Sequence, residues 1–342
     1  MKSKILINSI LVSSLLILFQ NCSQKGFNAS TQMQSTSASE TTNQQDNPDN
    51  SECVNNCNDS TNNDDTNVSD GNTAPPPSSK GIIFHDNFES ADLLTTNSDG
   101  FEWLNTNRTS IVNSDQYVVW NGSLINNGPI ANRQWEGYNG DHSMRFRYPA
   151  NQYMAEQRFS LGKPYKDLWI YFALRVPINF KHGTNSPTNS KLFAIWMDGY
   201  SNKGDGSTVI WEYWNSGDGG SNVTVHYSPG GGGSAGGHIQ STPFIKYPED
   251  QGRWMEIILH VKASSKNGVN DGLVELYNRK DGEKTFTQIH LLENIQLNYP
   301  PTGEPQGWAK GYLMGWSNPS FSEDTEWLMD DFTVSTSSLL PQ

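Results

Sequence analysis

From residue 81 to the C-terminus, short runs of alternating apolar and polar residues are separated by clusters of Gly, Asn, Asp and Pro. The runs are rich in β-branched and aromatic side chains, and no long stretch follows the helical period. Many short strands joined by turns predict an all-β fold of two antiparallel sheets packed face to face, a jelly-roll sandwich. We expect strands at residues 154–161, 167–176, 191–198, 208–214, 223–227, 254–262, 272–277, 311–316 and 327–335, and a flexible Gly-rich loop at 229–237.

Alternation within a strand also assigns side chains to the two faces of a sheet. Along residues 254–262, Glu256 and His260 alternate with apolar residues, which predicts that the apolar set faces the core. The same rule applies to three other strands. In the first, Lys191 and Phe193 share one face and Trp196 lies on the other. In the second, Glu212 and Trp214 share one face and Trp211 and Tyr213 the other, and in the third His226 and Tyr227 lie on opposite faces.

The N-terminus has the pattern of an export signal. Lys2 and Lys4 precede a mostly apolar stretch, residues 5–19, which is too short to cross a membrane comfortably. The position of Cys22 after this stretch resembles a bacterial lipobox. The resemblance implies a signal peptide at residues 1–21, a lipid on Cys22 and, because serine follows, an outer-membrane lipoprotein. An ordinary secretion signal with an incidental cysteine is the alternative.

Residues 22–80 contain almost no large apolar side chains, so they cannot bury enough apolar area to offset the entropy of ordering. They predict a disordered tether that separates the anchor from the domain at 81–342. Within the tether, Cys53 and Cys57 favour a small disulfide loop, because export leads to an oxidising compartment. Half of a metal site is the alternative for this pair.

Composition narrows the partners of the domain. All 11 Trp lie in residues 81–342, which is enough chain for one large β domain with a substantial core. The whole chain has a net charge of −13 and the domain is itself acidic, which argues against nucleic acid, because that partner needs a basic face. It leaves acidic glycans open, because a local basic cleft can lie within an acidic surface.

No catalytic signature of high specificity is present: the chain has no His-Glu-x-x-His and no phosphate-binding glycine loop. Glu212 also has no acidic neighbour two or four residues away. The paired carboxylates of a glycoside hydrolase are therefore disfavoured.

Three parts of the domain carry a family pattern. They are DLWIYFALRVP at 167–177 with NSKLFAIW at 189–196, then residues 252–262 with 270–277, and then the closing stretch 324–332. Together they resemble alginate-lyase-type polysaccharide lyases of family 14, and the last two also occur widely in concanavalin A-like jelly rolls. The resemblance implies a concanavalin A-like jelly roll, polysaccharide lyase activity and a catalytic role for Lys191, which matches the family's lysine.

The chemistry of a lyase selects further candidates. β-Elimination of a uronate needs a group that neutralises the carboxylate, a base for the C5 proton and an acid for the leaving oxygen, and it requires no metal. Without dividing these roles, we expect the catalytic residues to be Lys191, His226, Tyr227 and Tyr213. The substrate-binding candidates are Trp196, Trp211, Trp214, Glu212, Arg158 and His260. Core packing is the alternative for the indoles, and solvated ion pairs are the alternative for the charged residues.

The ends of the domain suggest a structural metal. Asp86 follows the first apolar run and Asp331 lies in the last, and the first and last strands of jelly rolls often lie side by side. The two carboxylates are therefore candidates to share a calcium ion, with ordinary surface acids as the alternative.

The sequence thus favours an envelope-anchored, carbohydrate-active lipoprotein with a lyase-like domain that acts on an acidic polysaccharide or cell-surface glycan. Its contact with the membrane would be through the lipid alone. A non-catalytic glycan-binding or adhesion lipoprotein is the alternative, and a purely structural envelope protein is a third possibility.

Overall fold

The computed structural model describes residues 80–114, 117–120, 123–126, 135–230 and 236–341. All of them belong to the unit Ser69–Gln342. The predicted signal peptide, the lipidated Cys22, and Cys53 and Cys57 of the tether lie outside the described residues, as do residues 231–235 of the predicted Gly-rich loop.

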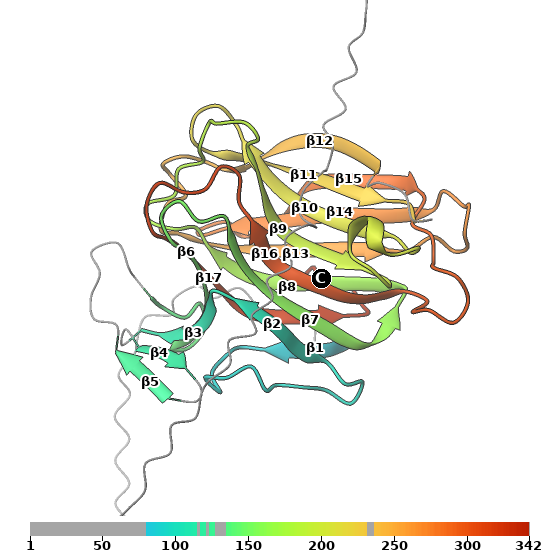
Figure 1. Ribbon diagram of the computed structural model, residues 1–342, viewed down its shortest axis with the longest axis horizontal. Coiled ribbons are helices and arrows are strands. Elements are labelled where there is room, and N and C mark those ends of the chain that lie inside the picture. Colours follow the sequence, from blue (N-terminus) through green and yellow to red (C-terminus); the bar gives the residue numbers. More distant parts are fainter. Residues whose placement is uncertain (1–79, 115–116, 121–122, 127–134, 231–235, 342) are drawn as a thin grey trace, which may run out of the picture. The chain divides into compact units, whose positions relative to one another are not determined.

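The described residues form two antiparallel sheets, which confirms the predicted jelly-roll sandwich (Figure 1). One sheet has ten strands in the order β15-β14-β13-β8-β17-β6-β3-β4-β5, with β1 paired to β17, and the other has seven in the order β12-β11-β10-β9-β16-β7-β2. The strands of the ten-stranded sheet are β1 (Ile82–Asp86), β3 (Thr109–Asn113), β4 (Tyr117–Trp120), β5 (Ser123–Asn126), β6 (His142–Tyr148), β8 (Asp167–Arg175), β13 (Trp254–Lys262), β14 (Gly272–Lys280), β15 (Thr287–Ile295) and β17 (Thr325–Ser335). Those of the seven-stranded sheet are β2 (Glu102–Asn107), β7 (Met154–Tyr165), β9 (Asn189–Trp196), β10 (Thr208–Asn215), β11 (Ser221–Ser228), β12 (Gly236–Ile245) and β16 (Trp308–Trp316).

Helix is nearly absent from this part of the chain. The described residues contain one short 3₁₀ helix, η1 (Ser201–Lys203), between β9 and β10. None of the described helical structure is long and apolar enough to cross a bilayer.

Each predicted strand corresponds to an observed one, with ends that shift by a few residues. The pattern missed strands whose side chains alternate weakly. β2, which lies at an edge of the seven-stranded sheet, has no buried residue, so selection for apolar residues on one face is weak there.

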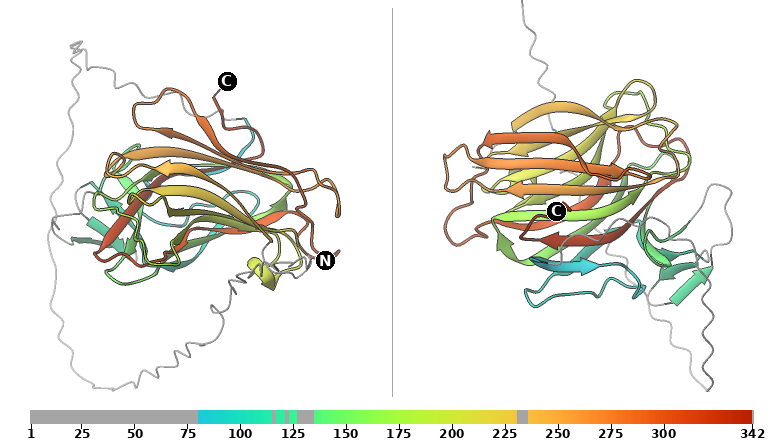
Figure 2. Two further views of the ribbon diagram at one scale, coloured as in Figure 1. Left: turned by 90° about the horizontal axis from the view of Figure 1, so that it is seen from above. Right: turned by 180° about the vertical axis from the view of Figure 1, so that it is seen from behind.

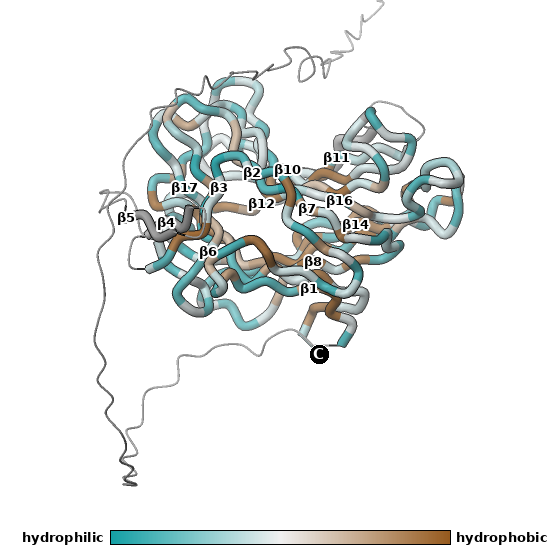
Figure 3. The backbone as a smooth tube through the Cα atoms, turned by 60° about the horizontal axis from the view of Figure 1, so that its bottom comes forward, coloured by the Kyte–Doolittle hydropathy of each residue, from teal (hydrophilic) through white to brown (hydrophobic). Residues whose placement is uncertain are grey.

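The core lies between the two sheets, which are seen as separate layers in Figure 2. Apolar stretches run along the strands, whereas the connecting loops are mostly hydrophilic (Figure 3). The largest fully buried side chains include Trp211, Trp308 and Trp327. In β13 the alternating apolar residues are all buried in this core, as the alternation predicted; they are Met255, Ile257, Leu259 and Val261.

The first and last strands lie side by side, as expected. β1 pairs antiparallel with β17, and Asp86 lies opposite Phe332. β17 pairs with β6 along its first half and with β1 along its second half, and the ladder between β17 and β8 shifts register between Asp330 and Thr333.

Candidate functional site

A β-bulge in β9 decides which side chains share the outer face of the seven-stranded sheet. β9 pairs Phe193 with Trp211 but Lys191 with Glu212, so Leu192 is the extra residue of the bulge. Leu192 and Phe193 both lie in the core, and Lys191 lies on the opposite face. The expectation that Lys191 shares the face of Phe193 is therefore wrong, because the bulge resets the alternation.

Four side chains from three adjacent strands converge on the carboxylate of Glu212. The ammonium of Lys191 donates to Oε1, and Nδ1 of His226 lies 2.9 Å from Oε2. The indole N–H of Trp214 donates to Oε2 at 2.9 Å, and the side-chain amide of Asn189 donates to Oε1 at 3.4 Å. We call these five residues the Glu212 cluster.

Glu212 is completely buried, and the side chain of Lys191 is only 12% exposed. The ring centroids of Trp214 and His226, which both contact Glu212, are 6.2 Å apart. Burial on its own raises the pKa of Glu212, but Lys191 and His226 lower it to about 2. Glu212 is therefore ionised at neutral pH, and it holds the lysine and the imidazole in place.

A second polar group lies beside the cluster on the same face. On β7, Arg158 Nε contacts Glu156 Oε1 at 2.5 Å, and its guanidinium carbon lies 6.0 Å from the centre of the Trp196 ring. The hydroxyls of Tyr200 and Tyr312 are 2.8 Å apart, and Tyr312 pairs with Arg158 in the ladder between β16 and β7. Burial raises the pKa of both tyrosines, so both phenols are protonated at neutral pH.

The sequence missed Tyr200 and Tyr312. Tyr312 is part of a predicted strand, but only the neighbour order β7-β16-β9 shows that it lies between Arg158 on β7 and Ala194 on β9. Tyr200 follows β9 in a turn, where no alternation rule applies.

Three predicted site residues lie on the other side of the sheet. Trp211 and Tyr213 are fully buried between the two sheets, and Tyr227 packs against the same core. They are separated from Glu212, Trp214 and His226 by the strand alternation itself. A role in which Trp211, Tyr213 or Tyr227 contacts substrate beside Glu212 is therefore inconsistent with the fold.

His260 lies on the outer face of the ten-stranded sheet and so belongs to a different surface. Its Nε2 is 2.8 Å from Asp167 Oδ1 and its Nδ1 is 2.5 Å from Glu275 Oε2, while its ring stacks on Trp169. Burial lowers the pKa of His260, but the two carboxylates outweigh that effect and raise it above the usual value. The structure does not bring His260 together with the Glu212 cluster.

The two predicted calcium ligands, Asp86 and Asp331, accept hydrogen bonds from other residues of the protein. Asp86 accepts hydrogen bonds from the indole N–H of Trp103 at 2.8 Å and from the amide of Phe88, and Asp331 accepts one from the side chain of Asn139. Both acids are buried, so neither is an ordinary surface acid. Among the described residues no group of three His, Cys, Asp or Glu side chains is placed to hold a metal ion, and the calcium ion stays a prediction.

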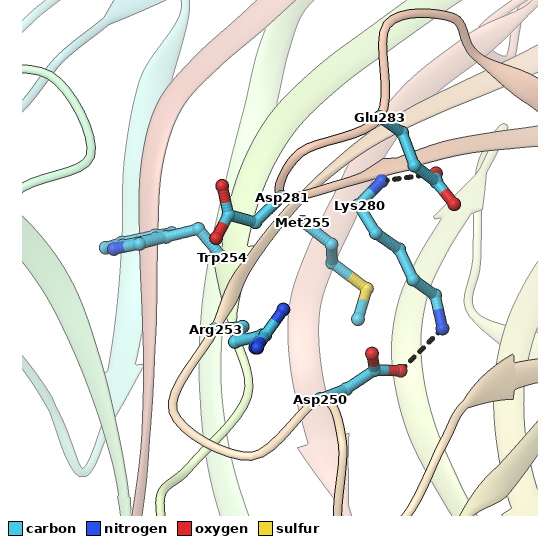
Figure 4. A pocket seen from close by; sticks show the side chains of 7 residues that line it. All are labelled: Asp250, Arg253, Trp254, Met255, Lys280, Asp281 and Glu283. Carbon is cyan, nitrogen blue, oxygen red and sulfur yellow. Dashed lines mark hydrogen bonds and ion pairs between the residues drawn. The ribbon is translucent and has the colours of Figure 1, made fainter. Parts of the chain in front are cut away.

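A small hollow of about 130 Å³ lies at the β13–β14 end of the ten-stranded sheet (Figure 4). Lys280 lines it and contacts Asp250 Oδ2 at 2.5 Å, and Arg253 and Trp254 also line it. No residue of the Glu212 cluster lines this hollow.

Comparisons with known proteins give structural neighbours only. No protein-family model and no curated protein matches the chain. One solved structure of similar fold is a PL-14 alginate lyase from Aplysia kurodai, with 12% identity, coverage of 60% of this chain and 85% of that one, and a TM-score of 0.44. Another is the alginate lyase vAL-1 from Chlorella virus, with 11% identity, coverage of 69% and 94%, and a TM-score of 0.44.

The exoplasmic/lumenal domain of VIP36 is a third neighbour, with 11% identity, coverage of 73% and 87%, and a TM-score of 0.39. The structural neighbours thus include the lyases that the sequence motifs resemble. With identities this low and TM-scores below 0.5, these neighbours assign no chemistry to this chain.

Proposed function

We propose that the domain is a carbohydrate-active module that cleaves an acidic polysaccharide by β-elimination at the outer face of the seven-stranded sheet. One observation supports the proposal above all: a lysine, an imidazole and an indole converge on the single buried carboxylate of Glu212. An arginine and a pair of protonated tyrosines lie beside them. These are the groups that the reaction needs.

The proposed roles follow from charge and protonation. Glu212 is a positioning residue: its contact with Nδ1 of His226 favours the tautomer whose Nε2 carries the lone pair, so His226 is the base for the C5 proton. As the C5–H bond breaks, a C4–C5 double bond forms and the C4–O bond to the leaving sugar breaks. The Tyr200–Tyr312 pair supplies the proton to that oxygen, and the cations Lys191 and Arg158 neutralise the uronate carboxylate.

The test is the ultraviolet absorbance of unsaturated products when the protein is incubated with a panel of uronate polymers. We expect His226→Ala and Lys191→Ala to abolish the signal. Lys262→Ala is the matched control, because Lys262 is an exposed lysine at the end of a strand in the other sheet. Full activity of the His226 and Lys191 variants would exclude this site.

A non-catalytic glycan-binding module is the second candidate, and one observation favours it. Lys191 is paired with Glu212 and Arg158 with Glu156, so both cations already have a counter-charge in the fold. Binding on a glycan array that Trp214→Ala weakens, with no absorbance from any polymer, would support this candidate over the lyase.

We also propose that the chain is a lipoprotein of the outer membrane, on the basis of Cys22 and the preceding signal. In cells, the wild type should partition into the detergent phase of a phase-separation assay and incorporate labelled fatty acid. Cys22→Ser should abolish both, and an unchanged partition of this variant would refute the anchor.

A further inference from the structure

A stacked aromatic pair with one exposed ring, that of Tyr153, lies next to the start of β7. Tyr153 is 45% exposed and is one of two large apolar residues, with Leu94, that are exposed in the described part of the chain. Its ring stacks on Trp316 at the end of β16, with centroids 5.1 Å apart and ring planes at 10°. An exposed, ordered ring of this kind presents an apolar surface that the fold does not need for its core.

A chain of hydrogen bonds connects this pair to the Glu212 cluster. The indole N–H of Trp316 donates to Asn318 Oδ1 at 2.6 Å, and the amide of Asn318 donates to Asn189 Oδ1 at 3.3 Å. Asn189 in turn donates to Glu212. The aromatic pair is thus linked by side chains to the residues that hold the proposed base.

Alternation places this chain on the same face as the cluster. The hydroxyls of Ser190 and Ser317 contact each other at 3.0 Å and are buried on the core side. Their neighbours Asn189 and Asn318 therefore point to the outer face, as does Trp316 two residues before Asn318. The outer face carries Trp214 on β10 and Trp316 on β16, with β9 between them.

We propose that Tyr153 and Trp316 form a second sugar-binding subsite, which stacks on a pyranose ring of the same glycan whose reacting unit lies at the Glu212 cluster. This inference rests on the proposed function and adds a length requirement to it. Strands two apart in a sheet are separated by about 10 Å, so one monosaccharide cannot contact both subsites. Tyr153 provides the exposed ring and Trp316 backs it, while the amides of Asn189 and Asn318 suit sugar hydroxyls.

The test is the dependence of affinity on oligosaccharide length, measured by calorimetry. The probes are oligosaccharides of increasing length prepared from the uronate polymer that the wild type binds or cleaves in the assay above. Tyr153→Ala should weaken binding of the longer oligomers about five- to tenfold and leave the shortest ligand unaffected. Tyr153→Phe, which keeps the ring, should bind like the wild type. Leu94→Ala is the control for loss of an exposed apolar side chain and should also bind like the wild type.

Three outcomes would overturn the subsite. If wild type binds the glycan but Tyr153→Ala has unchanged affinity at every length, the subsite is wrong and the proposed function stands. If wild type binds no polymer of the panel, the subsite and the proposed function both fail. If Tyr153→Ala instead changes the sedimentation coefficient at equal concentration, with binding unchanged, the pair is a contact between protein molecules.

Discussion

Replacement of Glu212 by glutamine tests the organisation of the proposed site. The variant keeps the size of the side chain and one carbonyl oxygen, but it removes the charge that neutralises Lys191. Lys191 would then be a cation with only 12% of its side chain exposed and no carboxylate partner at position 212. A buried charge without its partner is costly, so we expect a large loss of stability together with a loss of activity.

Two independent arguments give the magnitude. Removal of one partner from a buried ion pair costs about 3–5 kcal/mol. The pKa of Glu212 is lowered from 4.5 to about 2, which corresponds to about 3 kcal/mol of preference for the ionised form. Because Glu212 is completely buried, solvent screening does not reduce this figure substantially.

The pH dependence has a defined sign. A carboxylate whose pKa is lower in the folded state stabilises the fold fully above its unfolded pKa, here 4.5, and loses that contribution as the pH falls towards 2. The difference in unfolding free energy between wild type and Glu212→Gln should therefore be largest at neutral pH and should shrink below pH 4.5. Urea denaturation at a series of pH values measures it.

The controls separate charge from packing. Glu102→Gln, at an exposed position in β2 of the same sheet, should change stability little. The double variant Lys191→Met with Glu212→Leu removes both charges and should recover much of the stability but none of the activity. A loss below about 1 kcal/mol for Glu212→Gln at neutral pH would refute the buried pair, because that is the range of exposed ion pairs.

Further predictions concern other parts of the domain. His260→Gln should lower the melting temperature most below pH 6.5 and progressively less at higher pH, because a raised histidine pKa gives stability that is lost as the pH rises through the folded value. Trp211→Ala should destabilise the fold by about 3–5 kcal/mol in urea denaturation, whereas Trp214→Ala should mainly reduce glycan binding. Addition of a chelator should lower the melting temperature if calcium links Asp86 and Asp331, and an unchanged value would exclude that ion.

Strands that pack one face on the core could be predicted from the sequence, because that packing imposes a period of two. In β13 the alternating apolar residues face the core as expected, and Glu256, Ile258 and His260 on its other face are buried as well. The exposed edge strand β2 could not be predicted, because water tolerates polar residues on both of its faces. Local pattern thus reports burial, and it is weakest where both faces of a strand are in contact with water.

The candidate site was predicted less completely, for a physical reason that lies in one residue. The bulge at Leu192 adds a position without a cross-strand partner, and this moves Lys191 to the face of Glu212. Leucine at this position fits either register, so the sequence carries no sign of the bulge. Tyr312 depends on a further long-range fact, the placement of β16 beside β9.

The composition of the Glu212 cluster itself argues for a role beyond folding. A sheet face of this size gains little stability from a buried ion pair, since the cost of desolvating both charges offsets most of their attraction. Replacement of a buried ion pair by apolar side chains of similar volume is often neutral or stabilising. The fold nevertheless maintains a carboxylate with a strongly lowered pKa, and this carboxylate fixes a lysine, a histidine and an indole side by side. Such an arrangement is explained when the positions of those three groups are themselves what the protein uses.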